Sequence, residues 1–423
     1  MVKLEHHKEA TENKKITALP PPEKVFIPFC QHLGKLCLPE VKPGDKVLTG
    51  QRIASSGAMP SAAVHSSVTG TVSSIETCAH PVLGRCSAAV IETRLPDSFA
   101  FRAREARDVD SLQPAELLDI IRDAGLVGMG GAGFPSFLKL KPPVRVRTLI
   151  VNGAECEPYL TSDYRLMLEK SDEIIKGALL LGRILEVEDI CIAVEDNKPG
   201  AVELLLAKVS GPLRVKKLRS FYPQGGEKQL IKSVLGREVP RGKLPFETGA
   251  VVQNVATVFA AYEAVFLGKP LYERVVTVTG DCLSNPANLL VRTGTPISAL
   301  ISFCGPLKEE PHRIIIGGPM MGITQAGTDV PVTKTTSGVL VLGKKSGRIL
   351  EESACIRCGR CVRVCSTGLL PCMLGAAAER GMLEEAKRHG LTDCLECGAC
   401  TYVCPANRRL VQYIKRAKAE AAR

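Results

Sequence analysis

The sequence predicts a multidomain α/β protein, and three observations lead to this prediction. Its 423 residues exceed the roughly 250–300 residues at which single hydrophobic cores stop growing. The hydrophobic pattern changes from short alternating strands to alternating strands and helices, and then back to strands. Two cysteine-rich runs follow these segments. We therefore expect four folded domains in succession.

The first regular pattern covers residues 23–95, after a polar N-terminal tail at residues 1–22. Residues 41–76 alternate β-forming residues with Gly and Asp turns, which is typical of a small all-β unit. This segment resembles a barrel-sandwich domain of the lipoyl or biotinyl type. Such domains present a modifiable lysine at a hairpin tip, but the matching stretch AVHSSVTG has none. We expect a scaffolding domain, with His65 at the surface or in a turn.

Residues 110–268 follow the pattern of an α/β domain with a largely parallel sheet. After the helix-like PAELLDIIRDAG and a glycine-rich loop, strand-like and helix-like segments alternate: VRTLIVNGAE, SDEIIKGALLLGRIL, DICIAVED and PGAVELLLAKV. The apolar run 249–268 contains Gln253, Asn254 and Glu263, so it predicts a buried helix. Strand-like ERVVTVTG and RIIIGGPMMG, with helix-like PISALISF between them, predict a small α+β domain at residues 270–345.

The glycine-rich loop at residues 125–141, GLVGMGGAGFPSFLKLK, has the composition of a phosphate-binding loop. Glycines let the backbone approach a ligand, and consecutive N–H groups can hold a phosphate. The glycines concerned are Gly128, Gly130, Gly131 and Gly133. Phe134 and Lys139 add a flat apolar face and a cation, as a dinucleotide requires. A tight loop packed against a helix has the same composition, and this loop does not follow a strand as a Rossmann fingerprint does.

Two cysteine runs repeat the spacing CxxCxxCxxxC and predict two [4Fe-4S] clusters in a helical, ferredoxin-like domain at residues 350–410. In two-cluster ferredoxins the fourth cysteine of each run ligates the other cluster. The expected ligand sets are Cys355, Cys358, Cys361 and Cys404 for one cluster, and Cys394, Cys397, Cys400 and Cys365 for the other. Structural zinc is the alternative, but zinc takes four ligands and would leave cysteines over in each run. Cys372 is an alternative ligand to Cys365.

Composition and charge exclude several classes of protein. The 17 cysteines lack the short, even spacing of a secreted disulfide framework, so they indicate a reducing compartment. We find no secretory signal and no run of about 18 apolar residues, so we expect a soluble or peripheral protein. The net charge of +11, without Trp, indicates a basic surface that lacks stacking platforms for nucleic acid. Such a surface suits anionic lipid or an acidic electron carrier, and a basic helix at residues 411–423 either contacts one of these or is solvated.

Several motifs, taken in order, carry a resemblance to known proteins. GMGGAGFPSFLK, VNGAECEP, YPQGGEKQL and VVQNVATV resemble the flavin- and NADH-binding fold of the complex I flavoprotein subunit. Their order, with VFIPFCQHLGK, VEDNKPGA, DVPVTKTT and two ferredoxin motifs, is similar to that of the C subunit family of the Rnf electron-transport complex, over roughly residues 20 to 415. The resemblance implies a barrel-sandwich domain, a complex I flavoprotein-like FMN/NADH domain, a β-grasp-like (SLBB-type) domain and a two-cluster ferredoxin-like domain.

The resemblance also implies roles for individual residues. It assigns the loop glycines to FMN and NADH phosphate, Phe134 to the nicotinamide nucleotide and Lys139 to a phosphate. Residues that would hydrogen-bond the flavin or line the flavin and nucleotide site are Asn152, Asn254, Glu155, Glu157 and Glu227. Each of these polar residues has a turn or cap role as its alternative. Ala154 and Gly226 stand where the complex I family has acids, and Cys156 is expected to be buried and inert.

The implied function is electron transfer between NADH, FMN and two [4Fe-4S] clusters in a membrane-bound, ion-translocating NADH:ferredoxin oxidoreductase. In such enzymes the protein positions the cofactors and excludes water. The implied partners are NAD(H) and the other subunits of the membrane Rnf complex, including its ferredoxin-like iron-sulfur subunit. The implied location is the cytoplasmic face of the bacterial inner membrane, as a peripheral protein. Two alternatives stay open: a cobalamin (corrinoid) reductase of the propanediol-utilisation type, and a non-catalytic iron-sulfur electron-transfer adaptor.

Overall fold

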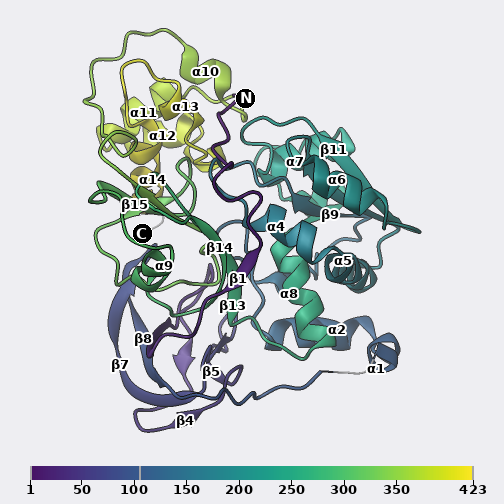
Figure 1. The fold of residues 1–423 in the computed structure, drawn as a ribbon. Helices are drawn as coiled ribbons and strands as arrows, with labels where there is room; N and C mark the ends of the chain where they lie inside the picture. The colour runs from purple at the N-terminus through teal and green to yellow at the C-terminus, as the bar shows by residue number, and fades with distance from the viewer. Residues whose placement is uncertain (1, 104–105, 422–423) are drawn as a thin grey trace.

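The computed structural model describes residues 2–103 and 106–421 (Figure 1). Its strands are β1 (Ile16–Ala18), β2 (Lys24–Pro28), β3 (Leu38–Pro39), β4 (Lys46–Val47), β5 (Arg52–Ser55), β6 (Val64–His65), β7 (Gly70–His80), β8 (Gly84–Thr93), β9 (Thr148–Gly153), β10 (Asp189–Glu195), β11 (Leu213–Leu218), β12 (Ala250–Asn254), β13 (Glu273–Thr279), β14 (Ala287–Arg292), β15 (Arg313–Ile316), β16 (Ile323–Gln325) and β17 (Gly338–Leu342).

Its helices are α1 (Ala106–Ser111), α2 (Pro114–Asp123), α3 (Ser136–Lys139), α4 (Ser162–Glu169), α5 (Ser171–Leu185), α6 (Pro199–Leu206), α7 (Glu227–Leu235), η1 (Pro245–Thr248), α8 (Val255–Phe266), α9 (Ile297–Phe303), α10 (Arg360–Val364), α11 (Pro371–Glu379), α12 (Leu383–Arg388), η2 (Leu391–Asp393), α13 (Ala399–Tyr402) and α14 (Leu410–Ala421).

The first domain consists of two antiparallel sheets, ordered β2-β8-β7-β4 and β3-β5-β6. Alternate residues of these strands meet in a common apolar core that includes Val25, Ile53 and Ile91, as expected for strands with one buried face. The expectation for His65 was wrong. It ends β6 with 5 % of its surface exposed, and burial lowers its pKa.

The α/β domain is built on a parallel sheet ordered β11-β10-β9-β12. Leu149 and Val151 of β9 face one side, where α2, α5 and α8 pack, whereas Ile150 faces α7 on the other side. The run 249–268 differs from the expected helix, because its first part is strand β12 and only Val255–Phe266 forms α8. The carboxyl ends of β9, β10 and β12 meet at one edge, where ligands bind in open α/β sheets.

A third, mixed sheet has the order β1-β14-β13-β17-β15-β16. Its edge strand β1 comes from the N-terminal tail, where Ile16 pairs with Asn288 in parallel. Ahead of this strand, Lys8 and Thr11 are almost completely buried. The tail is therefore an integral part of the folded structure, and it runs across the α/β domain and the third sheet (Figure 1).

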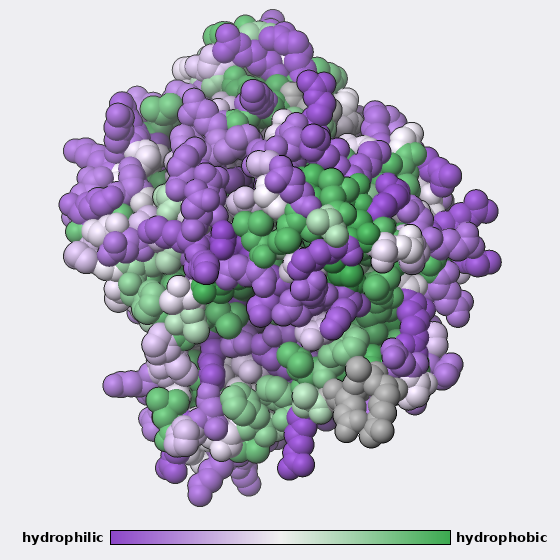
Figure 2. Space-filling model, turned by 45° about the vertical axis from the view of Figure 1, so that its right-hand side comes forward, coloured by the Kyte–Doolittle hydropathy of each residue, from purple (hydrophilic) through white to green (hydrophobic). Residues whose placement is uncertain are grey.

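Short helices α10 to α14 form the cysteine-rich domain, at the opposite end of the molecule from β4 and β7 (Figure 1). The expected basic helix begins at Leu410, and its Ile414 and Ala417 pack against Leu374 and Ala378 of α11, so one of its faces is buried. Residues 422–423 of that expectation lie outside the described residues. Within the described ranges, no helix has the length and apolar character that a membrane span needs. Figure 2 shows a mainly hydrophilic face with hydrophobic patches across its middle.

Candidate functional site

A cavity of about 340 Å³ lies beside the glycine loop, in the α/β domain. The loop and α3 contribute Phe134 and Lys139, the first residue of α7 is Glu227, and η1 contributes Phe246. Lys139 Nζ lies 2.5 Å from Glu227 Oε1, and both side chains are partly exposed. The structure thus brings three of the expected nucleotide-site residues together around one hollow.

Two of the four loop glycines are required by their surroundings. A Cβ at Gly130 would lie 2.8 Å from Asn254 Nδ2, and Gly133 has φ +73° with Thr335 Cγ2 2.8 Å from an added Cβ. A Cβ at Gly128 would make only an ordinary contact, and nothing lies within 4 Å of one at Gly131. The loop is closed by the Gly128 N–H, which donates to the Phe134 carbonyl over 2.9 Å. Backbone atoms near Gly131 are therefore the most open to a ligand.

Asn152 and Asn254 are neighbours in register at the carboxyl edge of the sheet. Asn152 Nδ2 donates to the Gly225 carbonyl over 2.9 Å. Asn254 caps α8 by accepting from the Ala256 N–H, and its Nδ2 donates to Asp163 Oδ2 over 2.7 Å. Both amides already have protein partners. They orient the edge of the site, and their oxygens retain capacity to accept further hydrogen bonds.

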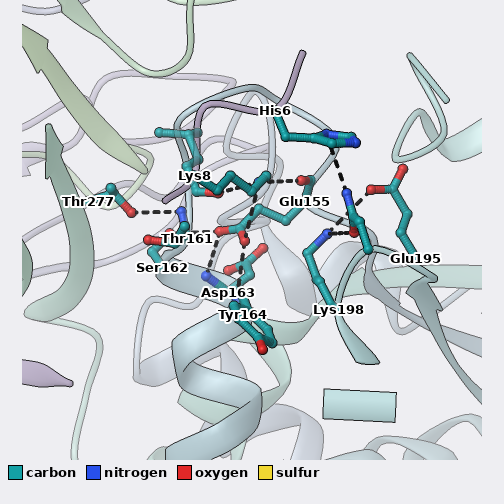
Figure 3. Close-up of polar contacts among 12 residues, drawn as sticks. His6, Lys8, Glu155, Thr161, Ser162, Asp163, Tyr164, Glu195, Lys198 and Thr277 are labelled. Atoms are coloured by element: carbon teal, nitrogen blue, oxygen red, sulfur yellow. Dashed lines mark hydrogen bonds and ion pairs between the residues drawn. The ribbon is translucent and has the colours of Figure 1, made fainter. Parts of the chain in front are cut away.

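Glu155 lies in a sealed group of charges, which we call the buried polar cluster, formed by Lys8, Glu155, Asp163, Glu195 and Lys198 (Figure 3). The Glu155 carboxylate accepts from the Asp163 N–H over 2.7 Å and lies 3.8 Å from Lys8 Nζ. Lys198 Nζ lies 3.3 Å from Glu195 Oε2. Burial raises the pKa of Asp163 to about 6 and lowers that of Lys8. Glu155 therefore caps α4 and binds the N-terminal tail, away from the cavity wall.

Glu157 also lies outside the cavity wall, at a junction of domains. Its carboxylate accepts from the N–H groups of Met320 and Met321 over 3.1 and 2.9 Å, and from the Tyr222 hydroxyl over 3.3 Å. The Tyr222 hydroxyl also lies 2.7 Å from the carbonyl of Cys397, as a donor to it. Burial raises the pKa of Glu157 to about 7. Glu157 and Tyr222 thus connect the α/β domain, the third sheet and the cysteine-rich domain.

The surroundings of the loop fit a polar ligand. Ser136 Oγ, at the start of α3, and Gln253 Nε2, at the end of β12, are buried without a protein partner among the described residues. Such orphaned atoms require a ligand or water. From below, the buried Arg274 guanidinium donates to the Met129 carbonyl over 3.3 Å and to the Lys334 carbonyl over 2.7 Å. Burial lowers the pKa of Arg274 to about 10, so it remains a cation at neutral pH and fixes the loop.

The two sets of expected cluster ligands differ in how closely the structure brings their cysteines together. Cys365 lines one narrow cavity together with the second run, Cys394, Cys397 and Cys400, as the crosswise assignment expects. Of the other set, Cys355 and Cys358 are exposed, and the thiol of Cys361 lies close to the alternative ligand Cys372. Cys404 lines a separate open hollow with Arg360 and Arg363. Across residues 2–103 and 106–421, no three His, Cys, Asp or Glu side chains are arranged to hold a metal ion. Thiolates are nevertheless the donors that iron-sulfur clusters use.

Cys156 is partly exposed, which differs from the fully buried residue expected. Burial of its thiol nevertheless raises its pKa to about 12, and its sulfur accepts from the Gly225 N–H. Sequence reasoning missed Lys8, Tyr222 and Arg274. Tyr222 is the first residue of the motif YPQGGEKQL, so the motif itself could have identified it. Lys8 lies in a polar tail whose composition carries no signal of burial.

Comparisons with known proteins agree with this architecture. Four family models match: the RnfC barrel sandwich hybrid domain at residues 2–95, the Nuo51 FMN-binding domain at 121–263, the SLBB domain at 275–324 and the 4Fe-4S dicluster domain at 348–405. A solved NAD+-reducing [NiFe]-hydrogenase chain, in the H2-reduced state, has a similar fold. The TM-score is 0.50 at 18% identity, over 77% of this chain and 66% of that chain.

Relatives extend over nearly the whole chain. The C subunit of the proton-translocating ferredoxin:NAD(+) oxidoreductase complex of Clostridium ljungdahlii is 48% identical over 98% of this chain and 91% of its own length. The Na(+)-translocating counterpart of Acetobacterium woodii is 41% identical over 98% and 95%. The C subunit of the ion-translocating oxidoreductase complex of Rhodobacter capsulatus is 40% identical over 98% and 81%. By these full-length similarities, the chain belongs to the C subunit family of the ion-translocating Rnf complexes.

Proposed function

We propose that this chain transfers electrons between NADH, FMN and two [4Fe-4S] clusters, as the NADH dehydrogenase module of an ion-translocating ferredoxin:NAD(+) oxidoreductase. The observation that carries the proposal is the connection between two sites. The cavity beside the glycine loop lies in the same domain as Tyr222, whose hydroxyl binds the carbonyl of Cys397 in the second cysteine run. A route from flavin to cluster therefore crosses a hydrogen-bonded domain junction.

The loop and its neighbours suit a flavin and a dinucleotide. The open backbone near Gly131, above the Arg274 cation, would hold phosphate oxygens, and Ser136 and Gln253 supply buried polar atoms that need a partner. The exposed Phe134 offers an apolar face to a ring, and Lys139 offers a cation to a phosphate. The bound flavin would supply the chemistry that converts a two-electron hydride transfer into single-electron steps.

The remaining expected residues act at a greater distance. We propose that Asn152 and Asn254 set the polar edge of the flavin site, while Glu155 fixes α4 beneath it. Glu157 would hold the domain junction, and Glu227 would control the position of Lys139 through their ion pair. We propose that the four cysteines of each crosswise set ligate one cluster, with Cys365 rather than Cys372 serving the second set.

We also propose the finer organisation that the sequence suggests. The domains would span residues 23–95, 110–268, 270–345 and 350–410, with a β-grasp-like arrangement in the third. The chain would bind the cytoplasmic face of the membrane peripherally, through the other subunits of its complex, among them an iron-sulfur subunit. The relatives, each named as the C subunit of such a complex, support this function over that of a corrinoid reductase.

An anaerobic NADH titration of the FMN-supplied, cluster-reconstituted protein tests the proposal, with flavin and iron-sulfur absorbance followed together. We expect flavin bleaching followed by cluster reduction. If dithionite reduces the clusters while NADH leaves flavin and clusters oxidised, the chain is a non-catalytic electron-transfer adaptor. Replacing Cys365 or Cys372 by Ser separates the ligand assignments, because only C365S should lose about half of the bound iron.

A further inference from the structure

The two cysteine sets occupy different places in the molecule, and this difference gives the electron path an inner and an outer end. The second run lies against the rest of the protein. The Cys397 carbonyl accepts from Tyr222, and a Cβ at Gly398 would lie 2.6 Å from the Met320 carbonyl. The Cys365 set is therefore the inner one, in contact with the domain that carries the glycine loop.

The first run lies at the surface. Cys355 and Cys358 are exposed, and Ile356 between them has 67 % of its surface exposed. Ahead of this run the chain is held in place, because the Ser353 N–H donates to the Ala406 carbonyl and Glu352 pairs with Arg408. The run is thus displayed on an anchored loop, at the end of the molecule remote from the barrel-sandwich domain (Figure 1).

Three arginines lie within or close to this run in the sequence, and we call them the arginine collar: Arg357, Arg360 and Arg363. All three are exposed, and Arg363 donates to the Cys358 carbonyl over 3.4 Å. In the described part of the chain, no ion pair joins a carboxylate to any of them, whereas Arg408 and Lys418 of the same domain are both paired. The collar therefore presents an unneutralised charge of three beside the outer cysteines.

The collar borders an open surface beside the proposed cluster ligand Cys404. An open hollow of about 620 Å³ is lined by Arg360, Arg363 and Cys404 and by Tyr402, an aromatic side chain that is 56 % exposed. Exposed Tyr and Arg are the residue types that dominate the energetics of protein interfaces. A hollow with positive charge at its rim attracts an acidic protein and raises the rate of encounter, most strongly at low salt.

We propose that the arginine collar is the docking surface for an acidic electron-transfer protein, and that electrons leave or enter the chain there through the outer cluster. The proposal rests on the proposed function, because it requires a cluster on the Cys355 set. In each encounter the reduced outer cluster loses one electron and the oxidised redox centre of the partner gains it. No bond forms or breaks, and the step runs in either direction.

The test compares the holoprotein with the triple variant R357Q/R360Q/R363Q, using a small, strongly acidic two-[4Fe-4S] ferredoxin as the probe. A matched control, K24Q/K42Q/K46Q, removes the same charge from three exposed lysines of the barrel-sandwich domain. Binding affinity is measured at several salt concentrations, and the rate of ferredoxin reduction is measured by stopped flow. Iron content and circular dichroism establish that each variant is folded and loaded.

We expect the collar variant to bind and reduce the ferredoxin about 10–100-fold less well at low salt and to lose most of the salt dependence, with NADH reduction of its own flavin and clusters unchanged. The control should match the wild type. Equal affinity and equal salt dependence in both variants would overturn the proposal. A second result would also overturn it: the collar variant no longer binds phosphatidylserine vesicles but still reduces ferredoxin normally. The collar would then be a membrane contact. If NADH fails to reduce the wild type, the proposed function is overturned instead. Docking can still be tested in that case, because dithionite reduces the clusters without NADH.

Discussion

The cavity beside the glycine loop and the buried polar cluster contain residues for which the family resemblance implies one shared site, yet they are built differently. Around the cavity, Lys139 and Glu227 form a partly exposed ion pair, and Phe134 is open to solvent. In the buried polar cluster, Lys8 and Glu155 have side chains only 6% and 4% exposed (Figure 3). The polar groups of the cavity are accessible to a ligand, whereas those of the buried polar cluster bind one another.

The difference shows that a binding motif contains residues that stabilise the fold as well as residues that can contact a ligand. An exposed ion pair is worth about 0–1 kcal/mol and is easily exchanged for a ligand contact. A buried pair is costly to break, because the remaining charge stays in the interior without a partner. Ligand affinity should therefore depend on the cavity residues, and stability on the cluster residues. Four substitutions separate these roles, and the size of the expected effect falls from the first to the last.

The largest effect is expected for Glu155→Ala. It removes the partner of Lys8 and the acceptor of the Asp163 N–H at the start of α4. We expect the free energy of unfolding to fall by about 3–5 kcal/mol, measured by urea titration. Glu173→Ala is the control, since it breaks only the partly exposed pair with Lys170 and should cost less than about 1 kcal/mol. Equal losses in the two variants would erase the contrast between sealed and open pairs.

Lys334 extends the comparison, because it is a buried lysine whose hydrogen-bond acceptors are carbonyls and not a carboxylate. Its Nζ donates to the carbonyls of Ala63 and Gly125 over 2.6 and 2.7 Å, and burial lowers its pKa to about 7. Between about pH 7 and 10.5 the unfolded chain binds this proton and the folded chain does not, so stability rises with pH there. We expect Lys334→Met to remove a slope of up to about 1.4 kcal/mol per pH unit, measured by unfolding at a series of pH values. Parallel wild-type and variant curves would contradict it.

On the open side, Phe134→Ala should change binding and not stability. Loss of an aromatic face costs about 0.5–1.5 kcal/mol of stacking, which predicts a rise of up to about tenfold in the dissociation constant for NADH. Calorimetric titration measures the affinity, and thermal unfolding measures the stability. Phe303→Ala, at a similarly exposed phenylalanine on α9, is the control and should leave NADH affinity unchanged. A large fall in melting temperature for Phe134→Ala would place this residue with the structural supports.

The smallest effect is expected for Lys139→Gln. The cation lies at the cavity wall 2.5 Å from Glu227, in a position that is 29% exposed, so solvent screens it. We expect a few-fold loss of NADH affinity that disappears as salt increases, with stability changed by less than about 1 kcal/mol. Titration at low and high salt measures this. A salt-independent loss would mean that Lys139 acts through packing rather than charge.

The sequence predicted the local features of this molecule better than its long-range contacts. In the α/β domain, α2, β9, α5, β10 and α6 lie where expected, because each has a pattern within a few residues. The joining of strand β12 to α8 was missed, because a continuous apolar run does not distinguish a buried strand from a buried helix. Domain boundaries and cluster ligation stay predictions.

Contacts between distant segments left no signal in the sequence. The partners of Glu157 at Met320 and Met321 belong to another domain, and nothing near Glu157 indicates them. Lys8 lies in a polar tail that composition alone describes as solvated, yet it is sealed against Glu155. For this reason the sequence motifs identified Glu155, Glu157 and Glu227, but they did not show which of these residues line the cavity and which stabilise the fold.

The buried N-terminal tail has a consequence for how the chain acquires its fold. Asn288 Nδ2 donates to the carbonyl of Thr11, a residue 277 positions earlier that is completely buried. During synthesis at roughly 5–20 residues per second, the tail waits about 15–55 s for that partner to emerge. The barrel-sandwich domain has local pairings and can form during this interval, whereas the tail cannot close until β14 exists. The tail is thus translated long before β14 but is among the last segments to find its native contacts.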